Sequence, residues 1–157
     1  MGPLRIIGIG NPLRGDDAVG LVAARRIRER LDHRTQVFEA DRSGVEILEL
    51  MQGARAVILI DAARSGRTPG TIHRFDASVG PISPLVLPHS SHALGAGDAL
   101  ELARALGILP PIVIVFGIEA HDTECGPPLS LPVTRALDEV VERVIQESEA
   151  LLCLSSM

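Results

Sequence analysis

The stretch LRIIGIGNPLRGDDAVG, residues 4–20, decides the fold class. It opens with a short apolar run rich in β-branched residues, which is typical of a buried strand. Glycines end this run, and after a polar loop the apolar residues of the segment 18–31 take up helical spacing. A strand that leads through a glycine-rich loop into an amphipathic helix is the repeating unit of an α/β sheet.

The same order of elements recurs along the rest of the chain. Further strands are predicted at residues 35–39, 56–60 and 112–116, and further helices at residues 44–51, 97–106 and 132–147. Residues 71–75 alternate more weakly after a Pro-Gly turn, which indicates an edge or antiparallel strand, and residues 76–93 predict a loop. We therefore expect a single domain over residues 1–157. Its fold class is α/β, a three-layer α/β/α sandwich around a mostly parallel sheet of about five strands.

Composition and charge exclude several classes of protein. With 46% hydrophobic and 22% charged residues, the chain has the composition of a folded domain. Its 20 acidic and 15 basic residues give a net charge of −5, without a basic tract, so we expect no nucleic-acid partner. Because no apolar run reaches the roughly 18 residues of a membrane span and no leader pattern is visible, we expect a cytoplasmic protein without a membrane partner.

The residue types that are missing limit the chemistry further. All 15 basic residues are arginines, which rules out mechanisms that need a lysine amine. Three phenylalanines are the only aromatic residues, so stacking platforms for bases or sugars are not expected. Cys125 and Cys153 are too few and too far apart for a disulfide framework or a zinc knuckle. Chemistry must therefore come from acids, histidine, serine, cysteine, arginine or the backbone.

Acidic side chains follow the ends of four predicted strands. They are Asp16 and Asp17, Asp41, Asp61, and Glu119. In an open α/β sheet, ligands bind beyond the carboxyl ends of the strands, at the point where the strand order reverses. We therefore expect these acids to lie along one rim of the sheet.

Each acid taken alone also has a structural interpretation. Asp16 or Asp17 could cap the helix that follows, which is worth about 1 kcal/mol, and Asp41 could cap a shorter helix. Glu119 could face solvent or pair with an arginine. Asp61 is harder to explain by packing, because a carboxylate at the end of an apolar central strand is costly unless it is paired, hydrogen-bonded or bound to a cation.

Taken together, the rim residues predict a metal site. Asp17 and Asp61 follow adjacent parallel strands, and His92 lies in the long loop before the third predicted helix. Two carboxylates and one imidazole make a three-ligand site with coordination positions left open. Open positions imply an ion that meets a substrate, and the residues leave both a resident and a substrate-borne ion possible.

Competing motifs fail at particular positions. The glycines at the end of the first strand resemble a dinucleotide-binding loop, but the third glycine of that motif would fall on Leu13. The pair Asp16 and Asp17 after the first strand, with Asp61 after the third, resembles a phospho-accepting receiver domain, which requires a lysine that this chain lacks. A serine hydrolase needs Gly-x-Ser-x-Gly, which is absent around Ser90, and no neighbouring group marks Cys125 as a nucleophile.

Five segments of the chain carry a family resemblance. They are IGNPLRGDDAVG at 9–20, DRSG at 41–44, LIDA at 59–62, SSHALG at 90–95 and FGIE at 116–119. In this order they resemble the NiFe-hydrogenase maturation endopeptidases over almost the whole chain, from about Leu4 to Val144. The opening segment and the Ser-Ser-His element are the specific parts of the match.

The resemblance implies a function and assigns roles to residues. It places the family's three metal-contacting positions on Asp17, Asp61 and His92, and a further position, linked to nickel-dependent recognition of the substrate, on Asp41. The implied activity is hydrolysis by an endopeptidase, grouped as aspartic-type, that removes a C-terminal extension from the NiFe-hydrogenase large-subunit precursor after nickel insertion. The implied metal is nickel carried by that substrate, and another divalent ion such as Cd²⁺ is expected to substitute in crystals. We expect the enzyme to be a monomer.

One departure from the family pattern keeps a second function open. The segment ECGPPLS, residues 124–130, carries Pro127 and Pro128 where relatives usually have a glycine-containing turn. This change bears on substrate docking and leaves the metal trio untouched. The alternative function is a non-catalytic checkpoint, which binds a nickel-loaded hydrogenase subunit without cutting it.

Overall fold

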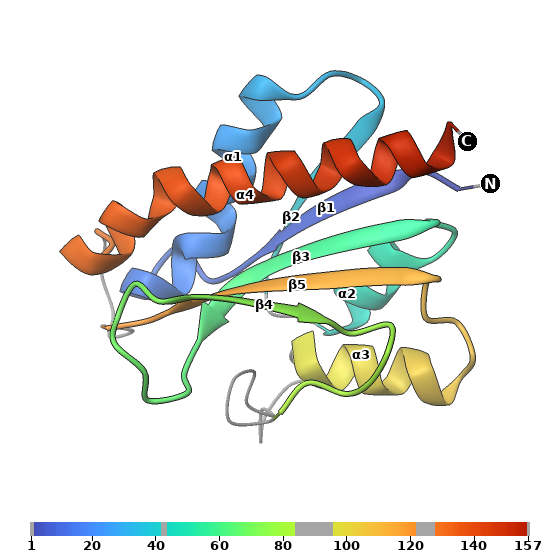
Figure 1. Cartoon of the computed structure of the whole chain (residues 1–157). Coiled ribbons are helices and arrows are strands. Elements are labelled where there is room, and N and C mark those ends of the chain that lie inside the picture. Colours follow the sequence, from blue (N-terminus) through green and yellow to red (C-terminus); the bar gives the residue numbers. More distant parts are fainter. Residues whose placement is uncertain (1, 42–43, 84–95, 122–127, 157) are drawn as a thin grey trace.

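The computed structural model describes residues 2–41, 44–83, 96–121 and 128–156 (Figure 1). Its strands are β1 (Leu4–Ile9), β2 (Thr35–Ala40), β3 (Ala56–Ala63), β4 (Ile72–Asp76) and β5 (Ile112–Glu119). Its helices are the 3₁₀ turn η1 (Gly15–Ala18) and α1 (Val19–Arg30), α2 (Gly44–Met51), α3 (Ala96–Ala105) and α4 (Leu131–Ser155). Strands and helices alternate along most of this order, as the sequence predicts.

The strands form one sheet in the order β2-β1-β3-β5-β4. All neighbouring pairs are parallel except β4 and β5, which are antiparallel. The predicted antiparallel edge strand is therefore confirmed, as is the mixed five-stranded sheet. Successive strands add to one side of β1 and then to the other, so the strand order reverses between β1 and β3.

Helices cover both faces of this sheet and bury its central strands β1, β3 and β5 almost completely. In Figure 1, α1 and α4 lie on one side of the strands, and α2 and α3 lie on the other. Every residue of β3 is buried. Ile58 and Ile60 belong to the core that contains α1 and α4, whereas Val57 and Leu59 belong to the core that contains α2 and α3. This alternation explains why the central strand reads as a continuous apolar run.

Three elements extend at least three residues beyond their predicted ends. β3 and β5 each continue three residues further than expected, because their parallel ladder extends through Asp61↔Gly117 to Ala63↔Glu119. Asp61 and Glu119 therefore lie inside strands. α4 ends at Ser155 instead of residue 147, because Leu151 continues its buried face.

In the described ranges, no helix, α4 included, combines the length and apolar character that a membrane span requires.

Two glycines allow α1 to lie directly against the sheet. A Cβ placed on Gly8 would lie 2.1 Å from the carbonyl oxygen of Gly20. A Cβ placed on Gly20 would lie 2.3 Å from the carbonyl oxygens of both Ile9 and Ile60. Such distances are far below van der Waals contact, so any larger residue would push the helix outward. The start of α1 is thereby fixed over β1 and β3, at the reversal of strand order.

Candidate functional site

Asp17 and Asp61 lie at the same end of the sheet, where the strand order reverses. Asp17 belongs to η1, which follows β1, and Asp61 lies in the parallel neighbour β3. The pairing of β1 with β3 runs as far as Gly8↔Ile60, so Asp61 is the next residue beyond it. The expectation that both acids share one rim is confirmed. His92, the third member of the predicted trio, lies outside the described residues.

A closed loop holds the backbone of Asp17. The Asn11 N–H donates to the Asp17 carbonyl oxygen at 3.1 Å, and the Asp17 N–H donates to the Arg14 carbonyl oxygen at 3.0 Å. A Cβ on Gly10 would lie 2.2 Å from the Asp17 carbonyl oxygen, so a glycine is needed there for the loop to close. The main chain thus fixes the position of Asp17, so that its side chain is preorganised before a ligand binds.

The side chain of Asp17 is buried beside an exposed cation. The Arg64 Nη2 atom donates to the Asp17 Oδ1 atom at 3.2 Å. The side chain of Asp17 is 3% exposed, whereas that of Arg64 is 44% exposed. Arg64 follows β3 directly, and sequence reasoning missed it. The one signal for it was indirect, because a buried carboxylate requires a partner.

Asp61 presents its carboxylate on one face of the central strand. It is buried, and its Oδ1 atom accepts a hydrogen bond from the Ala62 N–H at 2.8 Å. Side chains alternate along a strand, so Asp61 shares its face with Val57 and Leu59, the face covered by α2 and α3. In sequence, His92 comes shortly before α3. A contact between Asp61 and His92 stays a prediction.

Asp41 directly follows β2 and lies exposed on the same rim. It interacts with Glu46, in the first turn of α2. Burial raises the pKa of the Glu46 carboxyl group, and the negative charge of Asp41 raises it further. Two neighbouring acidic side chains make this corner of the rim attractive to cations.

Asp16 has a structural role, which corrects the interpretation of this acid as a cap. Its Oδ1 atom accepts from the Ser130 N–H at 2.7 Å, and its Oδ2 atom accepts from the Ser130 hydroxyl at 2.7 Å and the His121 N–H at 2.8 Å. Neither η1 nor α1 has a side-chain cap at its N-terminus. Asp16 instead ties η1 to the residues that follow β5 and precede α4. The two neighbouring acids therefore differ in role, because Asp16 joins separate elements of the fold whereas Asp17 pairs with Arg64 at the rim.

Glu119 is buried and holds a loop, which corrects the expectation that it faces solvent or an arginine. Its carboxylate accepts from the Ser65 N–H at 2.9 and 3.1 Å, from the Ser65 hydroxyl, and from His73 Nε2 at 3.2 Å. Burial raises the pKa of Glu119, but the hydrogen bonds from Ser65 and His73 outweigh it, so the pKa lies below its ordinary value. His73 is largely buried in this contact.

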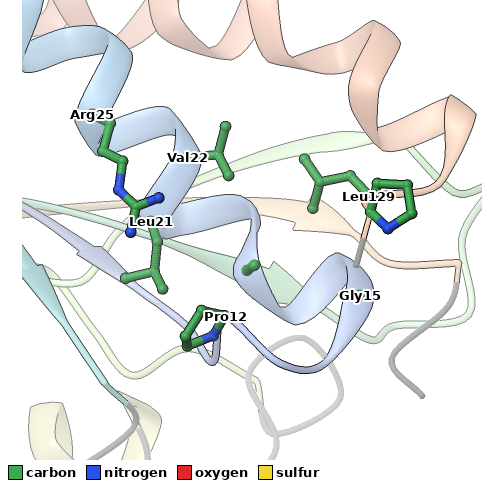
Figure 2. Close-up of a pocket in the computed structure, with 8 residues that line it drawn as sticks. Pro12, Gly15, Leu21, Val22, Arg25 and Leu129 are labelled. Carbon is green, nitrogen blue, oxygen red and sulfur yellow. The ribbon is translucent and has the colours of Figure 1, made fainter. Parts of the chain in front are cut away.

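An open cavity of about 270 Å³ lies beside the loop that carries Asp17 (Figure 2). Its walls come from the loop and η1, from α1, and from the segment before α4. They are formed by Pro12, Gly15, Ala18, Leu21, Val22, Arg25, Pro128 and Leu129. The lining is mostly apolar, and Leu13, on the same loop, is 69% exposed. An apolar surface therefore continues from the loop toward the start of α4.

The structure brings Asp17, Asp61 and Asp41 to one rim and assigns Asp16 and Glu119 to structural contacts. Across residues 2–41, 44–83, 96–121 and 128–156, no three His, Cys, Asp or Glu side chains are grouped as an ion-binding set. The predicted set needs His92 and so reaches beyond those ranges. Asp17 and Asp61 supply two buried carboxylates at this rim, and carboxylate oxygens are suitable ligands for a divalent ion.

The fold is shared with solved hydrogenase maturation enzymes. The hydrogenase maturating endopeptidase HybD from Escherichia coli superposes with a TM-score of 0.78, covering 94% of this chain and 93% of that chain at 22% identity. The NiFe-hydrogenase maturation protease HycI from Thermococcus kodakarensis KOD1 superposes with a TM-score of 0.68, covering 92% and 90% at 20% identity. At these identities the likeness concerns the fold.

Sequence comparison identifies the family. The hydrogenase expression/formation protein HupD from Rhodobacter capsulatus is 26% identical over 148 residues, which cover 92% of this chain and 70% of that protein. The hydrogenase 2 maturation protease from Escherichia coli is 26% identical over 146 residues, which cover 89% and 87%. The family model for hydrogenase maturation proteases matches residues 21–147. This chain therefore belongs to the hydrogenase maturation protease family.

Proposed function

We propose that this protein is an endopeptidase that removes the C-terminal extension from a NiFe-hydrogenase large-subunit precursor after nickel has been inserted. In this proposal, Asp17, Asp61 and His92 contact the nickel carried by the precursor, and Asp41 assists its recognition. The observation that carries the proposal is the pair of buried carboxylates, Asp17 and Asp61, at the reversal of strand order. Family membership supplies the peptidase activity.

The donor set suits an ion that is already bound elsewhere. Two carboxylates and one imidazole are hard and borderline ligands, and they leave coordination positions open. Such a set holds Ni²⁺ weakly on its own but can complete the coordination of an ion that a partner's thiolates hold. The contact between the rim and the nickel would then fix the precursor, so that its scissile peptide bond lies beside the metal.

The role of each protein residue follows from its place. The closed loop at residues 10–17 and the β3 ladder keep the carboxylates of Asp17 and Asp61 in fixed positions, so little entropy is lost when an ion arrives. Bound nickel supplies Lewis acidity that polarises a peptide carbonyl or a water molecule. Asp41 and Glu46 add negative charge to one side of the rim and attract the cation.

A second candidate function is a non-catalytic checkpoint that binds the nickel-loaded precursor without hydrolysing it. One observation favours this candidate. Pro127 and Pro128 replace the usual glycine-containing turn of the family, and Pro128 lines the apolar cavity beside the rim. A rigid turn at that place changes what the cavity can accept.

A single cleavage experiment separates these functions. The purified protein is incubated with nickel-loaded and nickel-free large-subunit precursor, and release of the C-terminal peptide is followed by mass spectrometry. The peptidase proposal predicts cleavage of the loaded precursor and no cleavage of the nickel-free one. Binding without cleavage would favour the checkpoint. Cleavage of both forms at equal rates would contradict nickel recognition altogether.

A further inference from the structure

The Asp17–Arg64 ion pair joins two groups with very different surroundings. The carboxylate is buried, whereas nearly half of the guanidinium side chain is in contact with solvent. The Arg64 Nη2 atom lies 3.2 Å from the Asp17 Oδ1 atom, which is at the long end for a charge-assisted hydrogen bond. Arg64 therefore neutralises Asp17 from the solvent side, which is also the side from which an ion would approach.

The backbone of Arg64 is fixed independently of its side chain. The next residue, Ser65, gives its N–H and its hydroxyl to Glu119. The far end of the loop is also attached to Glu119. The Gly70 N–H donates to the Glu119 carbonyl oxygen at 2.8 Å, and the Glu119 N–H donates to the Thr71 carbonyl oxygen at 2.8 Å. With both ends of the loop held, the guanidinium can leave Asp17 by rotation of the arginine side chain alone.

We propose that Arg64 is a displaceable counter-ion of Asp17, which weakens the binding of free divalent ions at the rim and yields to nickel presented by the precursor. The inference rests on the function proposed above. A carboxylate in a buried site requires a positive partner, and Arg64 provides one in the absence of substrate. A divalent ion at Asp17 would repel the guanidinium, so the two cations exclude each other.

This competition separates free ions from substrate-borne ones. A free hydrated ion must displace Arg64 with the help of the rim ligands alone. Nickel within the precursor arrives together with the contacts that the rest of the precursor makes, and their binding energy adds to the displacement. Arg64 thus acts as a specificity-determining residue, because it lowers the affinity of the rim for free ions more than its affinity for nickel carried by the precursor.

The test measures binding of free ions to the purified protein. Isothermal titration calorimetry with Ni²⁺, and separately with Cd²⁺, compares the parent with Arg64→Met, which keeps an unbranched apolar stem and removes the guanidinium charge. We expect Arg64→Met to bind tighter by on the order of tenfold. Arg67→Met is the matched control, since it removes a guanidinium from the same exposed loop, and we expect it to change affinity less than about twofold. Arg64→Gln replaces Arg64→Met if circular dichroism shows that the latter is unfolded.

A double variant assigns the effect to Asp17. In the Asp17→Asn background, Arg64→Met should give no gain in affinity, because the competition is for that carboxylate. Equal or weaker ion binding by Arg64→Met would overturn the proposal and make Arg64 a residue that orients Asp17. A gain that persists with Asp17→Asn would also overturn it. If the expected gains appear but the parent fails to cleave nickel-loaded precursor, the counter-ion role stands and the peptidase function falls.

Discussion

Asp17 and Glu119 are both buried carboxylates at the carboxyl end of the sheet, yet their partners differ in kind. Glu119 accepts hydrogen bonds from the backbone and hydroxyl of Ser65 and from His73, which are held in place by the fold. Asp17 is paired with Arg64, whose side chain lies partly in solvent. Fixed donors make a carboxylate part of the structure, whereas an exposed cation can be exchanged for another cation.

The largest expected effect concerns the carboxylates at the rim, those of Asp17 and Asp61. Asp17→Asn and Asp61→Asn keep the size of the side chain and remove the charge that faces the cation. Each should reduce cleavage of nickel-loaded precursor by more than about a hundredfold, because loss of a direct ligand exceeds the 10–100-fold cost of losing an outer-shell partner. Initial rates from mass spectrometry give the ratio.

Two control variants test whether the loss of cleavage is specific to the rim acids. Ser90→Ala and Cys125→Ala should cleave at nearly the parent rate, since neither residue is assigned a nucleophilic role. Loss of cleavage in Cys125→Ala would show ordinary nucleophilic proteolysis and contradict the assignment of the rim acids.

Glu119→Gln tests whether the Glu119 carboxylate, with its fixed hydrogen-bond donors, has a structural role. The amide cannot accept from all the donors of the carboxylate, so the folded state should lose about 2 kcal/mol in the free energy of unfolding. Chemical denaturation measures this loss. Glu139→Gln on the exposed side of α4 is the control and should change stability by less than about 0.5 kcal/mol. A Glu119→Gln protein as stable as the parent would remove the distinction between the two carboxylates.

The pH dependence of stability sharpens the same distinction. The pKa of Glu119 in the folded protein lies below the ordinary value of 4.5, so the unfolded state binds more protons as the pH falls. The stability contributed by Glu119 is therefore present above about pH 4.5 and is lost as the pH falls through the lowered pKa. The stability difference between the parent and Glu119→Gln should shrink below pH 4.5, as urea titrations at several pH values would show. A difference that grew at low pH would contradict the sign.

The smallest expected effect lies at the Asp41 corner of the rim. Burial and the charge of Asp41 both raise the pKa of Glu46, so Asp41→Asn should lower that pKa by removing the second cause. Glu49→Gln is the matched control, because the charge of Glu49 raises the pKa of Glu46 less than the charge of Asp41 does. Carboxyl chemical shifts followed by NMR give both values. An unchanged pKa of Glu46 in the Asp41→Asn protein would show that the charge of Asp41 does not act on Glu46.

Local sequence patterns were sufficient for the architecture. Apolar runs predicted the buried strands, and the weaker alternation at residues 71–75 predicted the antiparallel edge strand β4. The same patterns placed Asp17, Asp41 and Asp61 on one rim, because the carboxyl ends of parallel strands meet there. Strand ends were less well predicted, since the last residues of β3 are set by pairing with β5 and not by their own hydropathy.

The division of roles among the acids could not be predicted from the sequence. Asp16 binds Ser130, which is 114 residues away, and Glu119 binds Ser65, which is 54 residues away. Such partners are chosen by the fold, and nothing in the neighbouring sequence marks them. Arg64 was missed for the same reason, because an arginine at a strand end has no local pattern that assigns it to Asp17.

The most direct test of the central claim is an anomalous-scattering map from crystals soaked in Cd²⁺ or Ni²⁺. The account predicts an ion in contact with the carboxylates of Asp17 and Asp61 and the imidazole of His92. It also predicts weaker binding below about pH 6.5, where the imidazole becomes protonated. An ion bound elsewhere, with Asp17, Asp61 and His92 making no contact to it, would contradict the account.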